Sequence, residues 1–499
     1  MRKTMKRLSV FLACIIIGLS SSMVVNAEKG YTYNFDYWGD VQYSPDAYTV
    51  AQVLTGVDMG LDSKLVNPSA LYVRDNHVYI CDTNNHRIIE LERDDQGIFS
   101  LVREFDSFYG DVEINTFNTP TDIAVSEAGN IFIADKNNNR IVKLDKDLRF
   151  IMEFTKPDDP NFPQDLSFLP DKLCIDTADR VYCIATNVNK GVIKFEEDGE
   201  FSGFIGAAEV TYSFKDWLWK KLSTKEQRAQ MEAFVPTEYE NIFMDHEGFI
   251  YVCTSKASPA ELDAGDADAV KRLNLMGSDI LVRNGNWFVI GDIHWDEGGG
   301  YTGPSQIIDV TAMDNDIYYL LDKNRGRIFA YDDQGNLVYA FGGAGNQDGY
   351  FRQPAAIEHM GHDLLVLDSL DCSITVFRPT EFGQKIFDAV EQFQAGEYTR
   401  SGDTWQEVIA YNGNYDLAYI GVGRALMRQE RFGESLEYFE LKYDEENYSK
   451  AFKQYRKDVV EENILWVIIA LVVIFGVPTA IGKIKAIKHE IDTDEYFRR

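Results

Sequence analysis

Cysteine and basic residues are scarce in this sequence of 499 residues. It has six cysteines, and 49 lysines and arginines stand against 80 aspartates and glutamates, which gives a formal net charge of -31. A nucleic-acid-binding protein needs clustered Lys and Arg side chains to displace counterions from the phosphates. The shortage of basic residues therefore argues against a nucleic-acid partner, and the acidic excess disfavours direct binding to anionic polymers.

Familiar catalytic motifs are also missing. The sequence contains no GxSxG, HExxH or Walker pattern. Among seven histidines, His359 and His362 have a metal-ligand spacing, but one occupies an apolar strand position and the other a turn, so we expect them to point apart. The acidic run from Asp263 to Ala269 does not have the glycine and glutamate positions of an EF-hand loop. We therefore assign no catalytic residue, no metal ligand and no cofactor, with calcium as the alternative.

The cysteines do not form a recognisable framework. Cys14 lies near the amino end, and the other five have no CxxC spacing, while four of them sit inside apolar, strand-like runs. Buried free thiols are the preferred interpretation. A disulfide between neighbouring strands, such as Cys174 with Cys183, stays open. The five cysteines that follow the amino end are Cys81, Cys174, Cys183, Cys253 and Cys372.

Residues 1–27 have the three parts of a secretory signal peptide. Four basic residues precede an apolar run over residues 8–19, and small residues lead to Ala27, after which we expect cleavage. Cys14 lies in the middle of the apolar run, which disfavours a lipoprotein.

A second apolar run, Ile464 to Ile481, has no charged residue in eighteen positions. That is about the length needed to cross a hydrocarbon layer of ~30 Å at ~1.5 Å per residue. The basic residues on its two sides are too evenly distributed to orient it. With a signal peptide before it, the sequence predicts a single-pass protein of the plasma membrane with a large extracytoplasmic part, a transmembrane helix at 464–482 and a cytoplasmic tail at 483–499. The alternative is a buried core helix.

Six segments of the chain share one pattern: a proline, a strand-like run, a turn and a second strand-like run. A repeat of about 50 to 70 residues with period-2 strands and no helix of its own is typical of a propeller blade. We therefore predict a mainly β fold, with a six-bladed β-propeller over residues 28–379. The prolines that begin the segments are Pro68, Pro120, Pro170, Pro236, Pro304 and Pro354.

The polar turn of the first repeat, "CDTNNHRIIEL", recurs in later repeats. An aspartate enters the turn and an arginine often leaves it. Chemistry needs one copy of a site, whereas a structural turn is needed in every blade, so we interpret these residues as structural. They are Asp82, Asp135, Asp322 and Asp368 at the entry, and Arg87, Arg140 and Arg327 at the exit.

These turns resemble those of the NHL repeat, and "FGGAGNQDGYFRQPAAI" (Phe341 to Ile357) is similar to the Gly-rich linker and proline that join blades in that family. The resemblance covers about residues 48–378. The third, fourth and sixth copies depart from it, with Ala185 and Thr254 in place of the aspartate and Ser373 in place of the arginine.

Ring closure follows from an unassigned strand. The sixth copy ends without an outer strand, while "YTVAQVL" (Tyr48 to Leu54) reads as an outer strand without a blade. We predict that it completes the sixth blade and removes an open edge.

Two insertions lengthen the spacing between blades, near residues 207–235 and 277–303. Insertions decorate the faces of a propeller, where ligands usually bind, and these two contain aromatic residues suited to stacking on sugars or clamping a peptide. The alternative is that the rings pack the insertions down. The candidate binding residues are Trp217, Trp219, Trp287, His294, Trp295 and Tyr301.

From residue 380 the pattern becomes helical. Residues 34 apart match in type, such as Ala389 with Gly423 and Trp405 with Phe439, which resembles the tetratricopeptide repeat. We expect a small TPR-like region at 380–462, with fewer than the three units usually needed for independent stability.

Two functions are consistent with this organisation. The first is a non-enzymatic, membrane-anchored scaffold that binds a protein or glycan at the cell surface. Its domain order is similar to that of bacterial surface proteins thought to accompany carbohydrate uptake. The second is a metal-dependent hydrolase or lyase, because lactonases also use six-bladed propellers, with calcium in the channel. The innermost strands read mostly as Val, Ile, Leu and Ala, so we place no inward acidic residues there.

Overall fold

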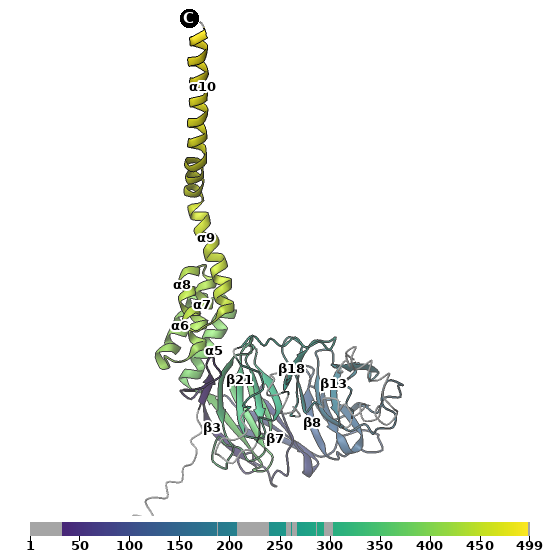
Figure 1. Cartoon of the computed structure of the whole chain (residues 1–499). Coiled ribbons are helices and arrows are strands. Elements are labelled where there is room, and N and C mark those ends of the chain that lie inside the picture. Colours follow the sequence, from purple (N-terminus) through teal and green to yellow (C-terminus); the bar gives the residue numbers. More distant parts are fainter. Residues whose placement is uncertain are drawn as a thin grey trace, which may run out of the picture. The chain divides into compact units, whose positions relative to one another are not determined.

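The computed structural model describes residues 32–186, 188–206, 239–255, 261, 267–285, 287–293 and 303–497 (Figure 1). The expected signal peptide and the insertion near 207–235 lie outside these residues. The chain divides into two compact units: Met1–Asn34 with Asp46–Arg378, and Phe35–Pro45 with Pro379–Arg499.

The first unit is a six-bladed β-propeller, as the sequence predicts. Its sheets are antiparallel, and blades one to three each have four strands. The strands of these blades are β4 (Ala70–Arg74), β5 (His77–Asp82), β6 (Arg87–Arg93) and β7 (Phe99–Phe105); β8 (Pro120–Val125), β9 (Ile131–Asp135), β10 (Arg140–Leu144) and β11 (Phe150–Phe154); and β12 (Pro170–Ile175), β13 (Val181–Ala185), β14 (Val192–Phe195) and β15 (Phe201–Ile205).

Blade four has three strands within the described residues, and blade five carries β1 beyond its fourth strand. The strands of the remaining blades are β16 (Asn241–Met244), β17 (Ile250–Cys253) and β18 (Val270–Leu273); β19 (Ile307–Ala312), β20 (Tyr318–Asp322), β21 (Arg327–Tyr331), β22 (Leu337–Gly342) and β1 (Thr32–Phe35); and β23 (Pro354–Met360), β24 (Asp363–Asp368), β25 (Ser373–Pro379) and β3 (Tyr48–Thr55). The short strand β2 (Val41–Ser44) belongs to the second unit.

Burial of the strands follows their place in a blade. β9 and β20 are buried at every position, because both faces of a blade pack on its neighbours. The outer strand β7 alternates between buried and more exposed positions, since the rim of a blade meets water on one face. The ring is closed by contacts between the innermost strands of successive blades. The pairs are β4 with β8, β8 with β12, β12 with β16, β16 with β19, β19 with β23, and finally β23 with β4.

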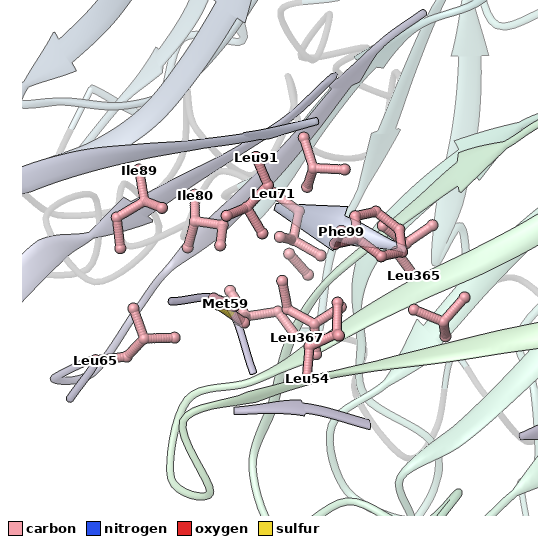
Figure 2. Close-up of a cluster of buried hydrophobic side chains, with 14 residues drawn as sticks. Leu54, Met59, Leu65, Leu71, Ile80, Ile89, Leu91, Phe99, Leu365 and Leu367 are labelled. Atoms are coloured by element: carbon pink, nitrogen blue, oxygen red, sulfur yellow. The ribbon is translucent and has the colours of Figure 1, made fainter. Parts of the chain in front are cut away.

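The predicted closure is confirmed: β3 is the fourth strand of the sheet β23-β24-β25-β3. Leu54 of β3 and Met59 just after it are buried among side chains of blades one and six, including Leu71, Ile80 and Leu367 (Figure 2). The amino-terminal part of the unit is thereby joined to its last blade.

All five cysteines within the described residues are free thiols, as the sequence favoured. Cys174 pairs with Tyr182 across the sheet, while Cys183 pairs with Leu173. Adjacent positions along a strand point to opposite faces, and Cys174 and Cys183 accordingly belong to different core clusters. This geometry excludes the disulfide between them.

The second unit contains the helices α5 (Glu381–Gln394), α6 (Tyr398–Tyr411), α7 (Asp416–Arg428) and α8 (Phe432–Leu441). A Cβ atom on Gly421 would lie 2.5 Å from the Trp405 ring, and one on Gly423 would lie 2.6 Å from the Phe439 ring. Small residues on α7 thus let both neighbouring helices approach closely. The resemblance of this region to tetratricopeptide repeats stays a prediction.

A long helix follows, made of α9 (Glu445–Leu471), the π-helical segment Val472–Gly476 and α10 (Val477–Phe497). It is long and apolar enough to cross a membrane, and its apolar stretch has no side chains packed over it. The π segment lies just before Pro478, which has no N–H to donate to the carbonyl of Ile474.

Candidate functional site

A cavity of about 460 Å³ lies where the innermost strands of all six blades meet. Its lining comes from β4, β8, β12, β16, β19 and β23, so it lies on the propeller axis. Such a volume is within the range of small-molecule sites, roughly 300–1,000 Å³. We call it the axial cavity.

Four polar side chains occupy one equivalent position in blades two to five. Asp122 faces Ala134 across its sheet, Lys172 faces Ile184, Asn241 faces Cys253 and Asp309 faces Leu321. In three of these blades the register shifts just before this residue, so a bulge follows the start of the innermost strand. All four side chains line the axial cavity.

The two aspartates also hold neighbouring blades together. Asp122 accepts hydrogen bonds from the N–H of Ile123 at 3.0 Å and from the N–H of Leu173 in the next blade at 2.8 Å. Asp309 accepts from the N–H of Val310 and from that of Ile357 in the next blade, each at 2.7 Å. Each carboxylate therefore joins its own innermost strand to the following one.

The remaining polar groups complete a network around the cavity. The Asn241 amide donates to Asp309, and the Lys172 ammonium donates to the carbonyl of Ser69 at 3.0 Å. Glu358 accepts from Thr311 Oγ1 at 3.3 Å, and His359 Nδ1 lies 2.7 Å from the same hydroxyl oxygen.

Burial dominates the electrostatics of this network. It raises the pKa of Asp122 to about 6 and that of Asp309 to about 7, although Lys172 and backbone N–H groups oppose the shift. Burial lowers the pKa of Lys172, but Asp122 and Asp309 more than offset this, so its pKa lies above the ordinary value. Burial also raises the pKa of Glu358 well above its usual range and lowers that of His359 to about 4.

Stability should therefore fall by more than about 1 kcal/mol as the pH rises from 6.5 to 8, because burial raises the pKa of both Asp309 and Glu358 in the folded protein. The folded-state pKa of Asp309 lies above its ordinary value of 3.8, so in this window the folded protein binds more protons than the unfolded chain. Below pH 6.5 the depressed pKa of His359 acts in the opposite direction. Urea unfolding at pH 6.5, 7.2 and 8 measures the slope. The variant Asp309→Asn should make it less steep, and a wild-type stability that rises over this range would contradict the assignment.

The repeated turns form a second set of buried polar groups. Asp82 accepts hydrogen bonds from the N–H of Val66 at 2.7 Å, from Asn85 Nδ2 at 2.8 Å and from Arg87 Nε at 2.8 Å. Three equivalent bonds reach Asp135, from the N–H of Asn118 at 2.7 Å, from Asn138 at 2.8 Å and from Arg140 at 3.0 Å.

In blades five and six the turn keeps its aspartate but changes its partners. Asp322 accepts from the N–H of Gln306 at 2.8 Å, and Asp368 accepts from that of Gln353 at 2.9 Å. Arg327 contacts Asp292 and the Tyr33 hydroxyl of β1. None of the predicted turn residues lines the axial cavity.

The predicted binding residues are not brought together within the described residues. Trp217, Trp219, His294, Trp295 and Tyr301 lie outside them. Trp287 is half-buried, its ring centroid lies 5.3 Å from that of Phe288, and it does not line the axial cavity. Within the part of the chain that the structure describes, no three His, Cys, Asp or Glu side chains converge in a metal-binding geometry.

The innermost strands, which read mostly as Val, Ile, Leu and Ala, do carry acidic residues that line the cavity, although we placed none there from the sequence. Asp122 and Lys172 each stand two residues after the proline that begins a blade, and this offset was the available signal. Glu358 interrupts an apolar strand four residues after its proline. Glu240 has the same spacing in the fourth copy but does not line the cavity, so the sequence pattern does not reveal where Glu358 points.

Comparisons with known proteins agree with the fold. The family model for the NHL repeat matches residues 65–90 and 117–144, which contain most of the first three strands of blades one and two. No curated protein sequence matches this chain.

Solved structures with a similar arrangement have low sequence identity. Virginiamycin B lyase from Staphylococcus aureus is 11% identical, with a TM-score of 0.37, and the match covers 66% of this chain and 99% of the lyase. An auxiliary nutrient binding protein from Bacteroides thetaiotaomicron is 12% identical, with a TM-score of 0.39, over 71% of this chain and 78% of that one. BamB from Moraxella catarrhalis is 12% identical, with a TM-score of 0.30, over 63% and 74%. These scores carry no argument about function. The chain thus carries NHL repeats in its first two blades and folds as a six-bladed β-propeller, with C-terminal helices and one helix apolar enough to cross a membrane.

Proposed function

We propose that the chain is a membrane-anchored, extracytoplasmic binding or scaffold protein whose propeller and following helices bind a protein or glycan partner. The observation that carries this proposal is the axial cavity, which is lined from all six blades by both hydrogen-bond donors and acceptors. A preformed concave site with a few convergent polar groups is typical of ligand recognition.

The state of the acidic groups favours binding over hydrolysis. Both oxygens of Asp122 and of Asp309 already accept backbone N–H groups, which fixes these carboxylates as parts of the scaffold. A general base must instead be within hydrogen-bond reach of a proton on the substrate.

The long apolar helix supports anchoring. An 18-residue window within Glu445–Ile491 has a mean hydropathy of 2.8. A cleaved signal peptide and this single span would leave the propeller outside the cell.

Two experiments test the proposal. The first crosslinks the full chain in intact cells and identifies the attached molecule, and the second is a glycan-binding screen. A reproducible protein or glycan partner is expected, and its recovery should decrease when excess unlabelled full chain competes. Metal analysis of the purified protein addresses the alternative: stoichiometric calcium or zinc together with a metal-dependent hydrolase or lyase activity, and no partner, would overturn the binding role.

A further inference from the structure

We propose that the axial cavity binds a small, neutral polyol of the size of a mono- or disaccharide, with Lys172, Asn241 and Glu358 as its polar contacts. This inference rests on the binding function proposed above and names the ligand class of that site. It concerns the interior of the propeller, whereas the sequence suggested binding in the inserted segments.

Unused hydrogen-bonding capacity is the first reason. The Lys172 ammonium has three N–H donors, and within the described residues it has one acceptor, the carbonyl of Ser69. The Asn241 amide has two donors and uses one on Asp309. Glu358 adds carboxyl oxygens to the lining. A hydroxyl group both donates and accepts, so adjacent hydroxyls of one ligand can bond to these groups together.

The balance of charge is the second reason. The single ammonium of Lys172 faces Asp122 and Asp309, which raise its pKa, and burial raises the pKa of Glu358 well above its usual range. Arg74, Asp75 and Asp314 also line the cavity, and Arg74 is paired with Asp75 and Glu127. Near neutrality Asp309 is itself only partly ionised. A charged ligand would lose its hydration in this cavity without gaining an unmatched opposite charge. A neutral polyol avoids that cost.

Aromatic walls are the third reason. Tyr72 and Phe243 line the cavity, and the Tyr72 hydroxyl is held by a 3.0 Å hydrogen bond to the carbonyl of Val125. The Phe243 ring lies 6.4 Å from the His359 ring in an edge-on arrangement. Rings of this kind offer apolar surface to the C–H face of a sugar, while the polar groups bind its hydroxyls.

Calorimetry on the full chain in lipid nanodiscs tests the proposal. Nanodiscs are used because alkyl glycoside detergents carry sugar headgroups that would compete. The probes are glucose, galactose, maltose, lactose and sorbitol, with putrescine as a cation and citrate as an anion. At least one neutral probe should bind, and neither charged probe should. Binding of a charged probe alone, or of none of the seven, would overturn the proposal.

Variants locate the site. Lys172→Met removes the ammonium and keeps most of the side-chain volume, and Glu358→Gln keeps the shape, so each should weaken binding by about tenfold. Lys194→Met is the matched control, because Lys194 lies on β14 outside the cavity, where it pairs with Glu196. The affinity of this variant for the probe should equal that of the wild type. Thermal unfolding checks that each variant is folded. If Lys172→Met does not fold, the affinity of Glu358→Gln alone tests the site.

Unchanged affinity in a folded Lys172→Met or Glu358→Gln protein would exclude the axial cavity. The two proposals fail separately. If crosslinking recovers a partner but no neutral probe binds, the binding role stands and the polyol site is wrong. If a polyol binds and no partner is recovered, the cavity assignment stands and the scaffold role is wrong.

Discussion

Deletion of residues 31–60 should abolish the cooperative unfolding transition of the propeller. The deletion removes β3, the fourth strand of the last blade, and leaves the edge of β25 without its partner. It also removes Leu54 and Met59 from the cluster shared by blades one and six (Figure 2). Truncating one large buried side chain costs about 2–5 kcal/mol, and whole domains are stable by only about 5–15 kcal/mol.

A point variant tests the same closure with less disruption. Leu54→Asp places a carboxylate among apolar side chains and should cost at least about 4 kcal/mol. Thr49→Asp is the matched control, because Thr49 lies on the same strand with its side chain exposed, and it should change stability by about 0.5 kcal/mol or less.

Urea unfolding followed by tryptophan fluorescence and by far-UV circular dichroism measures both changes. The wild type and Thr49→Asp should show one transition by both probes, and Leu54→Asp should unfold at a clearly lower urea concentration. A deletion variant that keeps a single transition at the wild-type midpoint would contradict a stabilising role for this closure.

The ring and its closure were predictable because they depend on patterns that the sequence displays. Six prolines mark the blades, and the period-2 strand at Tyr48–Leu54 has no partner in its own part of the chain. A strand without a blade and a blade without an outer strand admit one simple pairing. The structure contains that pairing.

The axial cavity was not predictable in the same way. A bulge between Pro120 and Asp122, and another between Pro170 and Lys172, shift the register by one residue. A one-residue shift changes which face a side chain occupies, and hydrophobic alternation alone does not reveal it. One hydrogen bond from the next blade then holds Asp122 in place, and its donor, the N–H of Leu173, lies about fifty positions away in the sequence.

Long-range partners also explain the different behaviour of Arg327. The repeat pattern places it beside the turn aspartate, as Arg87 and Arg140 are placed. In blade five it instead contacts Asp292 and the hydroxyl of Tyr33, which is 294 positions away in the sequence. Because β1 adds to this blade alone, no comparison among the repeats could show this contact.

Asp135→Ala should destabilise the propeller by about 3–5 kcal/mol, because it leaves the buried Arg140 guanidinium without its main acceptor. It also leaves the N–H of Asn118 without the carboxylate that accepts from it. Asp145→Ala is the matched control: Asp145 accepts two backbone N–H groups in the hairpin turn between β10 and β11, in a more exposed setting, and its loss should cost about 1 kcal/mol.

Two further variants separate charge from shape. Asp135→Asn keeps one carbonyl acceptor and should fall between the wild type and Asp135→Ala. The double variant Asp135→Ala with Arg140→Ala removes the stranded charge, so its cost should be less than the sum of the single changes. Chemical denaturation of the wild type, of these four variants and of the single variant Arg140→Ala gives these free energies. A cost for Asp135→Ala no larger than that of Asp145→Ala would contradict a structural role.

The same change in the first blade distinguishes structure from chemistry. Asp82 has the same three kinds of donor as Asp135, including Arg87, and its side chain is equally buried. If these aspartates stabilise the turns, Asp82→Ala should reproduce the loss of stability and leave ligand affinity unchanged in the protein that remains folded. A residue that acts on a ligand would show the reverse, with a large effect on affinity in one blade and a small effect on stability. Equal losses of stability in the two blades are therefore the result that recurrence of this turn predicts.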